Sequence, residues 1–313
     1  MPMERTNPFF KALLLGVLSS FFFAFTFLLN RSVNLGGGDF MWSASLRYFL
    51  TLPMLAIVLW RTTGFQRIFA EIRAYFGPWL VWSTVGFGLF YLPLSLGSVW
   101  GESWFVSACW ELTIVAGILL TPIFGKPIPV KNLLCSLVIL LGVALLQTSH
   151  LASARFTVKQ MLLTLLPILA AAFCYPLGNR KLMTLCPAEL STMERVFGMV
   201  LCSIPFWLIV ALLALLRTGL PSGGQILKCG SVALFSGTIA TGLFFHATDL
   251  VRENPRYLAA VESTQCGEVV FTLLGGVLVL HDAMPSPAGF AGLVLVVLGM
   301  ILSSLVSGTR HQG

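Results

Sequence analysis

Three glutamates stand inside long apolar stretches, where charge is costly. Glu111 follows Trp110, and Glu262 and Glu268 flank Gln265, which could hydrogen-bond to either of them. A charged side chain at the centre of a membrane costs about 2.5–3.5 kcal/mol on insertion scales, so such groups usually face a bundle interior. Because removal from water disfavours a charged carboxylate, each acid could hold or release a proton. A carboxylate that takes either a proton or a cationic substrate is the simplest basis for proton-coupled exchange. Alternatively, each acid is neutral or ion-paired and only joins helices.

Two arginines, Arg47 and Arg195, also fall in apolar stretches and are candidate partners of these acids. They could instead bind an anionic substrate group by forked hydrogen bonds. Arg195 follows Glu194 near the end of a stretch, so its side chain could equally extend to the membrane surface.

Histidine and aromatic residues add further candidates. His246 and Asp249 are three apart and share a helix face, which permits a proton relay or a local hydrogen bond. Aromatic faces attract organic cations. The aromatic residues that we expect to line a substrate site are Trp42, Tyr91, Trp110 and Tyr175.

The composition places these residues in a membrane. Of 313 residues, 57% are hydrophobic and 10% are charged, whereas soluble domains carry about 25% charged residues. The net charge is +7, but the basic residues stand singly between apolar runs, so we expect no nucleic acid partner. The seven cysteines have no CxxC spacing, and we expect no cofactor and no metal site.

Crossing the hydrocarbon core takes roughly 20 apolar residues in a helix, and the chain has ten such runs. We therefore predict an all-α integral membrane protein. The runs are about 9–30, 41–60, 78–97, 103–124, 131–148, 160–178, 194–216, 230–249, 257–280 and 286–307.

Loop charges predict the orientation. With a cytoplasmic N-terminus, twelve Lys and Arg residues fall inside and five fall outside, which favours both termini in the cytoplasm. The inside set is Arg5, Lys11, Arg61, Arg67, Arg73, Lys126, Lys131, Arg180, Lys181, Arg252, Arg256 and Arg310. We expect a bacterial inner membrane.

The two halves, 1–150 and 151–313, repeat one another. Asn30-Arg31 near the end of the first run matches Asn179-Arg180 near the end of the sixth. One shift of 157 positions places Glu111 on Glu268 and Gly142 on Gly299. Each half has an odd number of runs, so the second half must enter the membrane from the opposite side. The chain is therefore predicted to be two inverted five-helix repeats, a common plan of secondary transporters.

The end of the second half carries a family resemblance. It reads Glu268-Val-Val-Phe-Thr-Leu-Leu-Gly-Gly-Val, then His281-Asp282, then Gly292 and Gly299 seven apart. This resembles the ten-helix, multidrug-efflux-like (EamA-like) branch of the drug/metabolite transporter superfamily, over about 9–307. In that superfamily a half typically ends with a long helix, an acidic turn and a final helix with glycines seven apart. The first half departs from the pattern, with Lys126 near the turn and Cys135 at the first glycine position.

The resemblance implies a site between the halves, with spans 5 and 10 at the periphery. The related four-helix small multidrug transporters have an essential glutamate in their first helix. This chain has no acid in its first or sixth run, so any proton site must lie elsewhere.

We thus expect a secondary active transporter that moves a small organic solute by alternating access. Export of a cationic or amphiphilic compound, proton-coupled or by exchange, is the first hypothesis. The alternative is a metabolite transporter for an amino acid, purine or sugar conjugate, with Arg47 or Arg195 binding a negative group. A lipid-modifying membrane enzyme is the hypothesis from another class. Gly36-Gly37-Gly38-Asp39 matches the GxGD pattern of intramembrane proteases, but it falls in a predicted loop and no second aspartate stands in a suitable run, so the sequence does not favour a protease. The oligomeric state is open, and a monomer is one option.

Overall fold

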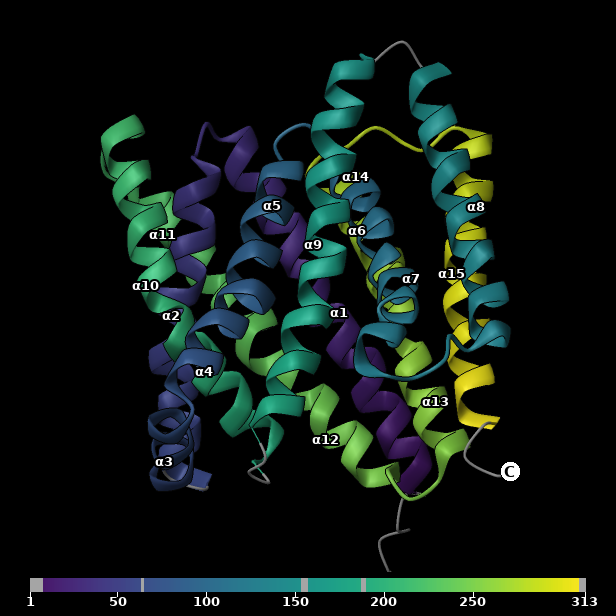
Figure 1. Ribbon diagram of the computed structural model, residues 1–313. Coiled ribbons are helices and arrows are strands. Elements are labelled where there is room, and N and C mark those ends of the chain that lie inside the picture. The colour runs from purple at the N-terminus through teal and green to yellow at the C-terminus, as the bar shows by residue number, and fades with distance from the viewer. Residues whose placement is uncertain (1–7, 63–64, 153–156, 187–189, 310–313) are drawn as a thin grey trace, which may run out of the picture.

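The computed structural model describes residues 8–62, 65–152, 157–186 and 190–309, and within these ranges it contains helices and no strand (Figure 1). Three basic residues that count toward the predicted orientation lie outside the described residues: Arg5 and Arg310 of the inside set, and Arg155 of the outside set. The helices are α1 (Pro8–Leu35), α2 (Phe40–Thr62), α3 (Gln66–Ala74), α4 (Phe76–Ser83), η1 (Thr84–Gly88), α5 (Leu89–Gly97), α6 (Ser103–Trp110), α7 (Leu112–Leu119), η2 (Thr121–Phe124), α8 (Val130–Ala152), α9 (Val158–Leu185), α10 (Thr192–Thr218), α11 (Gly223–Val232), η3 (Ala233–Ala240), α12 (Thr241–Val251), α13 (Pro255–Ser263), η4 (Thr264–Cys266), α14 (Gly267–Val279) and α15 (Pro287–Thr309).

Each of the ten predicted runs falls on helical structure. Among the described residues, seven helical segments are long and apolar enough to cross a membrane, and two shorter apolar segments cover Ser103–Leu119 and Val130–Leu146. The ninth run is divided between α13 and α14. The chain is therefore an all-helical integral membrane protein.

Side-chain caps define several helix starts. Thr157 and Gln160 form a capping box at the start of α9, and Ser191 and Glu194 form one at the start of α10. Asp39 Oδ1 accepts hydrogen bonds from the backbone N–H groups of Met41 (2.8 Å) and Trp42 (3.1 Å) at the start of α2. The aspartate of the GxGD pattern is thus an N-cap of α2.

Four of the ten predicted runs depart from regular α-geometry, in two pairs. The third and eighth runs contain the π-helical segments η1 and η3. The fourth run is interrupted at Glu111, and the ninth at the 3₁₀ turn η4. Our expectation of one helix over 257–280 is therefore wrong. Ser263 and Thr264 donate their hydroxyls to backbone carbonyls three residues earlier, a bond that competes with helix continuation.

The packing of the long helices is reciprocal. α1 packs against α11, η3, α12 and α14, while α9 packs against α4, η1, α5 and α7. α2 packs against α10. In Figure 1, α1 begins and α15 ends at the same end of the molecule, as an even number of crossings requires.

The fifth and tenth runs, α8 and α15, form a pair at one side of the molecule (Figure 1). Glycines let their backbones meet: a Cβ added to Gly142 would lie 2.7 Å from the Gly292 carbonyl oxygen. The same addition at Gly299 would lie 2.8 Å from the Ile139 nitrogen. Such contacts hold membrane helices together by close packing.

The short helix α3 lies in the polar connection that follows α2. Its Ile68 is fully buried and reaches Gly198 of α10 beside Trp79. Since α3 also packs on α4, it joins the two halves at the end of the molecule opposite the α14–α15 connection (Figure 1).

Candidate functional site

The two interrupted helices bring Glu111 and Glu268 together. Glu111 is 5% exposed and Glu268 is 8% exposed, and they lie close enough to interact electrostatically. Glu111 precedes the first residue of α7, and Glu268 is in the first turn of α14. The Oε1 atom of Glu268 has no hydrogen-bond partner among the described residues.

Arg47 of α2 is the basic group of this site. Its guanidinium donates to Thr26 Oγ1 (3.3 Å) and to Ser236 Oγ (3.2 Å), and it lies over the Tyr91 ring at 4.1 Å. It also interacts electrostatically with Glu268, although no hydrogen bond joins the two within the described chain. Hydroxyl groups and an aromatic face therefore hold Arg47 in place, and the carboxyl of Glu268 remains available to bind a proton or a cation.

Tyr91 connects Arg47 to α1. It is fully buried, and its hydroxyl exchanges hydrogen bonds with the Asn30 amide at 3.0 and 3.2 Å. Tyr48 meets the Tyr91 ring edge-on at 5.7 Å and stacks on Trp207 at 4.6 Å. These contacts hold the ring under Arg47 in one orientation.

Three further rings form a cluster that reaches the acids, because Tyr175 interacts electrostatically with Glu268. The Phe90, Trp110 and Tyr175 centroids lie 4.9 to 5.6 Å apart in each pairing. Tyr175 is 37% exposed, whereas the acids are buried. An aromatic cluster next to carboxyl groups is suited to an organic cation with a flat apolar body.

Gln265 adjoins Cys266, which approaches Glu111, whereas Glu262 lies on the preceding helix α13. Gln265 belongs to η4, and its Nε2 atom is buried without a hydrogen-bond partner in the described chain. Cys266, the next residue, interacts electrostatically with Glu111. Glu262 is exposed on α13, on the other side of the 3₁₀ turn.

The remaining predicted residues lie apart from this cluster. Trp42 donates from its indole to the Gly219 carbonyl (2.8 Å) at the start of α2. Arg195 is half-buried in the first turn of α10. His246 and Asp249 are exposed on α12, and no hydrogen bond joins them within the described residues.

Several polar and aromatic members of the site were not among the residues predicted from the sequence. They are Thr26, Asn30, Tyr48, Phe90 and Ser236. A signal for two of them was present. Ser19, Thr26 and Asn30 are spaced by seven and four residues, which puts them on one face of α1.

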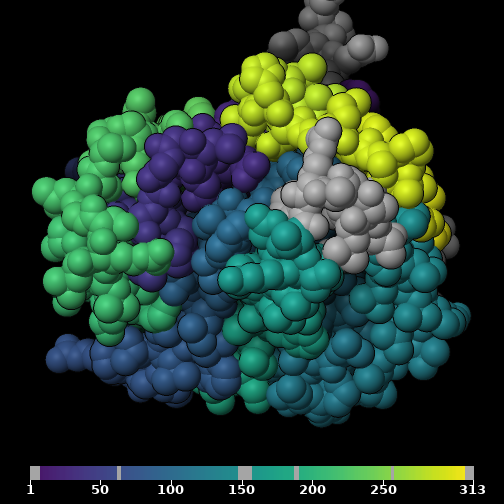
Figure 2. Space-filling model, turned by 90° about the horizontal axis from the view of Figure 1, so that it is seen from above, coloured from purple at the N-terminus to yellow at the C-terminus, as the bar shows by residue number. Residues whose placement is uncertain are grey.

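A polar network closes the end of the molecule at which α6 begins. Asp282 forms an ion pair with Arg31 (3.4 Å) and accepts from the backbone N–H (2.9 Å) and hydroxyl (2.6 Å) of Ser103. Arg31 also donates to the Val99 carbonyl at 3.3 Å. Figure 2 shows this end, where the yellow residues before α15 lie beside the purple residues near the start of α2.

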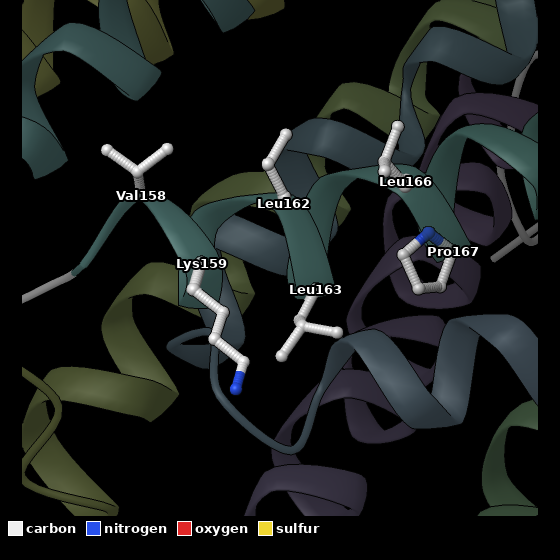
Figure 3. Close-up of a pocket in the computed structure, with 6 residues that line it drawn as sticks. All are labelled: Val158, Lys159, Leu162, Leu163, Leu166 and Pro167. Carbon is white, nitrogen blue, oxygen red and sulfur yellow. The ribbon is translucent and has the colours of Figure 1, made fainter.

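A separate hollow runs along the first turns of α9 (Figure 3). It is lined by Val158, Lys159, Leu162, Leu163, Leu166 and Pro167. None of the predicted site residues contributes to it, and its lining is apolar except for the Lys159 amine. It is a hollow of the helix surface, separate from the buried acids.

Comparison with families and curated proteins gives three matches. Residues 10–309 match the model of the family described as "EmrE: Putative multidrug resistance efflux transporter". The chain is 43% identical over 313 residues to the uncharacterized protein YjlA of Bacillus subtilis (strain 168), with 96% of each chain covered. It is 41% identical over 268 residues to an uncharacterized 42.1 kDa protein of Shouchella clausii from the intracellular alkaline protease 3′ region, covering 82% of this chain and 70% of that protein.

One solved structure, described only as a crystal structure of a protein, has the same fold. It superimposes with a TM-score of 0.60 over 96% of this chain and 99% of that chain, at 15% sequence identity. At this identity the likeness concerns the fold alone.

Proposed function

Because the chain belongs to the EmrE family of multidrug resistance efflux transporters, we propose that it exports a cationic or amphiphilic organic compound in exchange for protons. The family consists of membrane transporters and not of enzymes, and a small-molecule substrate and a lipid bilayer follow from it. The resemblance expected from the sequence is confirmed. The observation that carries the proposal is the pair of buried carboxyl groups, Glu111 and Glu268, beside an aromatic cluster.

The site favours a cation over an anion. An anionic substrate group near Arg47 would also meet Glu268, and the guanidinium already donates to Thr26 and Ser236. Arg195 lies away from the cluster in the first turn of α10. The metabolite alternative therefore has less support. Thermal shifts of the purified protein with cationic and anionic compound libraries test this choice, and stabilisation by anions alone would reject the export of cations.

We propose that residues 1–150 and 151–313 form two inverted repeats around this site. Three observations support the proposal: α1 and α9 have reciprocal packing partners, π-helical segments recur in the third and eighth runs, and interruptions recur in the fourth and ninth. Glu111 and Glu268, which the shift of 157 relates, both stand at the start of the second part of their run. Such halves could exchange conformations and so alternate access.

We propose a bacterial inner membrane with both termini in the cytoplasm. The bacterial origin of the relatives and the twelve-to-five distribution of loop charges support this. The Asp282 network then closes the outer end.

The aromatic cluster should determine apparent substrate affinity. We expect Trp110→Ala to raise the KM for an aromatic cation about tenfold, because a cation–π contact contributes about 1–2 kcal/mol. The maximal rate should change little. The concentration dependence of uptake into proteoliposomes measures both values. Trp60→Ala is the matched control, since Trp60 is 74% exposed at the end of α2; equal KM values in the two variants would contradict the role of Trp110.

The outer network should limit access to the site from outside. We expect Asp282→Asn to speed the labelling of Cys266 by a membrane-impermeant maleimide about tenfold, because the change weakens hydrogen bonds to a charged group. The assay uses a chain with Cys266 as its sole cysteine in right-side-out vesicles. Asp249→Asn, which changes an exposed acid on α12, serves as the control. Equal labelling rates in the two variants would show that Asp282 does not close this end.

A further inference from the structure

The centre of the site contains three formal charges. Arg47 carries one positive charge, and Glu111 and Glu268 carry two negative charges when both are ionised. The other titratable groups that approach them are neutral when protonated: Tyr48 of α2, Tyr91 of α5, Tyr175 of α9, Cys229 of α11 and Cys266 of η4. Glu262 of α13 and His246 of α12 are exposed, and the charged residues of α1, Lys11 and Arg31, lie near its ends.

Arg47 is a fixed member of this set. A guanidinium stays protonated in proteins. Its hydrogen bonds to Thr26 and Ser236 and its position over the Tyr91 ring keep it in place without a carboxylate partner in hydrogen-bond contact. The guanidinium therefore offsets one of the two carboxylates in every step of a transport cycle.

We propose that Arg47 sets the charge selectivity of the site, so that it takes one monovalent cation in place of one proton and excludes dications. With both acids ionised the site has one negative charge in excess. One proton or one monovalent cation neutralises it, whereas a dication leaves one uncompensated positive charge. Because an uncompensated charge away from water is costly, the neutral states dominate. This inference rests on the proposed exchange of cations for protons.

The test uses two probes of almost equal size. N-methyl-4,4′-bipyridinium is a monocation, and N,N′-dimethyl-4,4′-bipyridinium adds one methyl group and one charge. Calorimetry of the purified full-length protein in two buffers of different ionisation enthalpy gives affinity and the number of protons released. We expect the monocation to bind at least about tenfold more tightly than the dication and to release one proton.

Substitutions at Arg47 then change the charge in known steps. Arg47→Lys keeps the charge and should keep the preference for the monocation. Arg47→Gln leaves two negative charges in excess and should admit the dication with release of two protons. The double variant Arg47→Gln/Glu111→Gln returns the excess to one and should recover the monocation preference. If Arg47→Gln does not fold, Glu111→Gln alone, with no excess charge, should bind the monocation at least about tenfold more weakly than the unmodified protein and should release no proton.

The outcomes separate this inference from the function on which it rests. Proton release without a preference between the two probes, or an unchanged preference in Arg47→Gln, would overturn the role of Arg47 and leave the exchange of cations for protons intact. Binding of neither cation, together with pH-independent uptake in proteoliposomes, would overturn both.

Discussion

Proteoliposomes containing Glu268→Gln should lose substrate uptake driven by a pH gradient. We expect at least about a hundredfold decrease, in line with the 2.5–3.5 kcal/mol involved in placing charge inside a membrane. A glutamine has nearly the shape of glutamate, but it can neither take up a proton nor balance a cation. Glu111→Gln should have the same effect, because the two acids lie together and share one compensating arginine.

Glu262→Gln is the matched control for these variants. Glu262 is six residues before Glu268 in the same predicted span, but it is exposed on α13. Substrate uptake by the Glu262→Gln variant should therefore keep the pH dependence of the unmodified protein. Unchanged pH profiles in both Glu111→Gln and Glu268→Gln would reject the assignment of the proton site. Loss of coupling in Glu262→Gln alone would move the site to the α13 side of the 3₁₀ turn.

Gly178→Ala should destabilise the folded protein. Overpacking typically costs about 1–3 kcal/mol, and we expect a value near the upper end of this range. A Cβ at Gly178 of α9 would collide with the backbone nitrogen and Cα of Gly86 in η1 and would lie 2.7 Å from the Trp82 carbonyl oxygen. Backbone atoms cannot rotate aside as a side chain can, so α9 must move away from η1. Thermal unfolding in detergent, followed by size-exclusion chromatography, measures the effect.

The same substitution at Gly242 of α12 provides the comparison. A Cβ at Gly242 would meet no atom within 4 Å. Because alanine is favoured over glycine in a helix by about 0.8–1.0 kcal/mol, Gly242→Ala should be neutral or stabilising. If Gly178→Ala melts at the same temperature as Gly242→Ala, the close contact of α9 and η1 does not contribute to stability.

The ten apolar runs could be found from the sequence because hydrophobic length is a property of the chain itself. Their interruptions could not, because they depend on local competition for backbone groups. Ser263 and Thr264 look like ordinary small polar residues in the sequence, yet their hydroxyls bind the carbonyls of α13. No proline stands between the start of this run and Glu111, so nothing in the sequence indicated the interruption there.

The site was predictable to a similar extent. The cost of placing a charged side chain inside a membrane was enough to select Glu111, Glu268 and Arg47 from the sequence, and the structure brings these three residues together. The same cost applies to Glu262 and Arg195, but the structure places both apart from these three residues. Helical spacing predicts which face a residue occupies only while the helix is regular, and the ninth run is interrupted between Glu262 and Glu268. Hydroxyl partners such as Thr26 and Ser236 carry no charge and so gave no comparable signal.

Among the described residues, the ion pair of Arg31 with Asp282 at the proposed outer end has no equivalent at the proposed inner end. Arg180, which the repeat relates to Arg31, donates to the Gly117 carbonyl oxygen, and Lys126 stands near the turn where an acid corresponding to Asp282 would be expected. Lys181 lies over the Phe124 ring at 5.2 Å at this end, so the turn is bordered by positive charge. The two states of an inverted repeat, one open to each side, would have equal free energy only if the contacts that close the two ends were equally strong. We therefore expect the transporter without substrate to favour the state that is closed to the outside. This preference would slow the return of exported compound into the cell even when the proton gradient has collapsed.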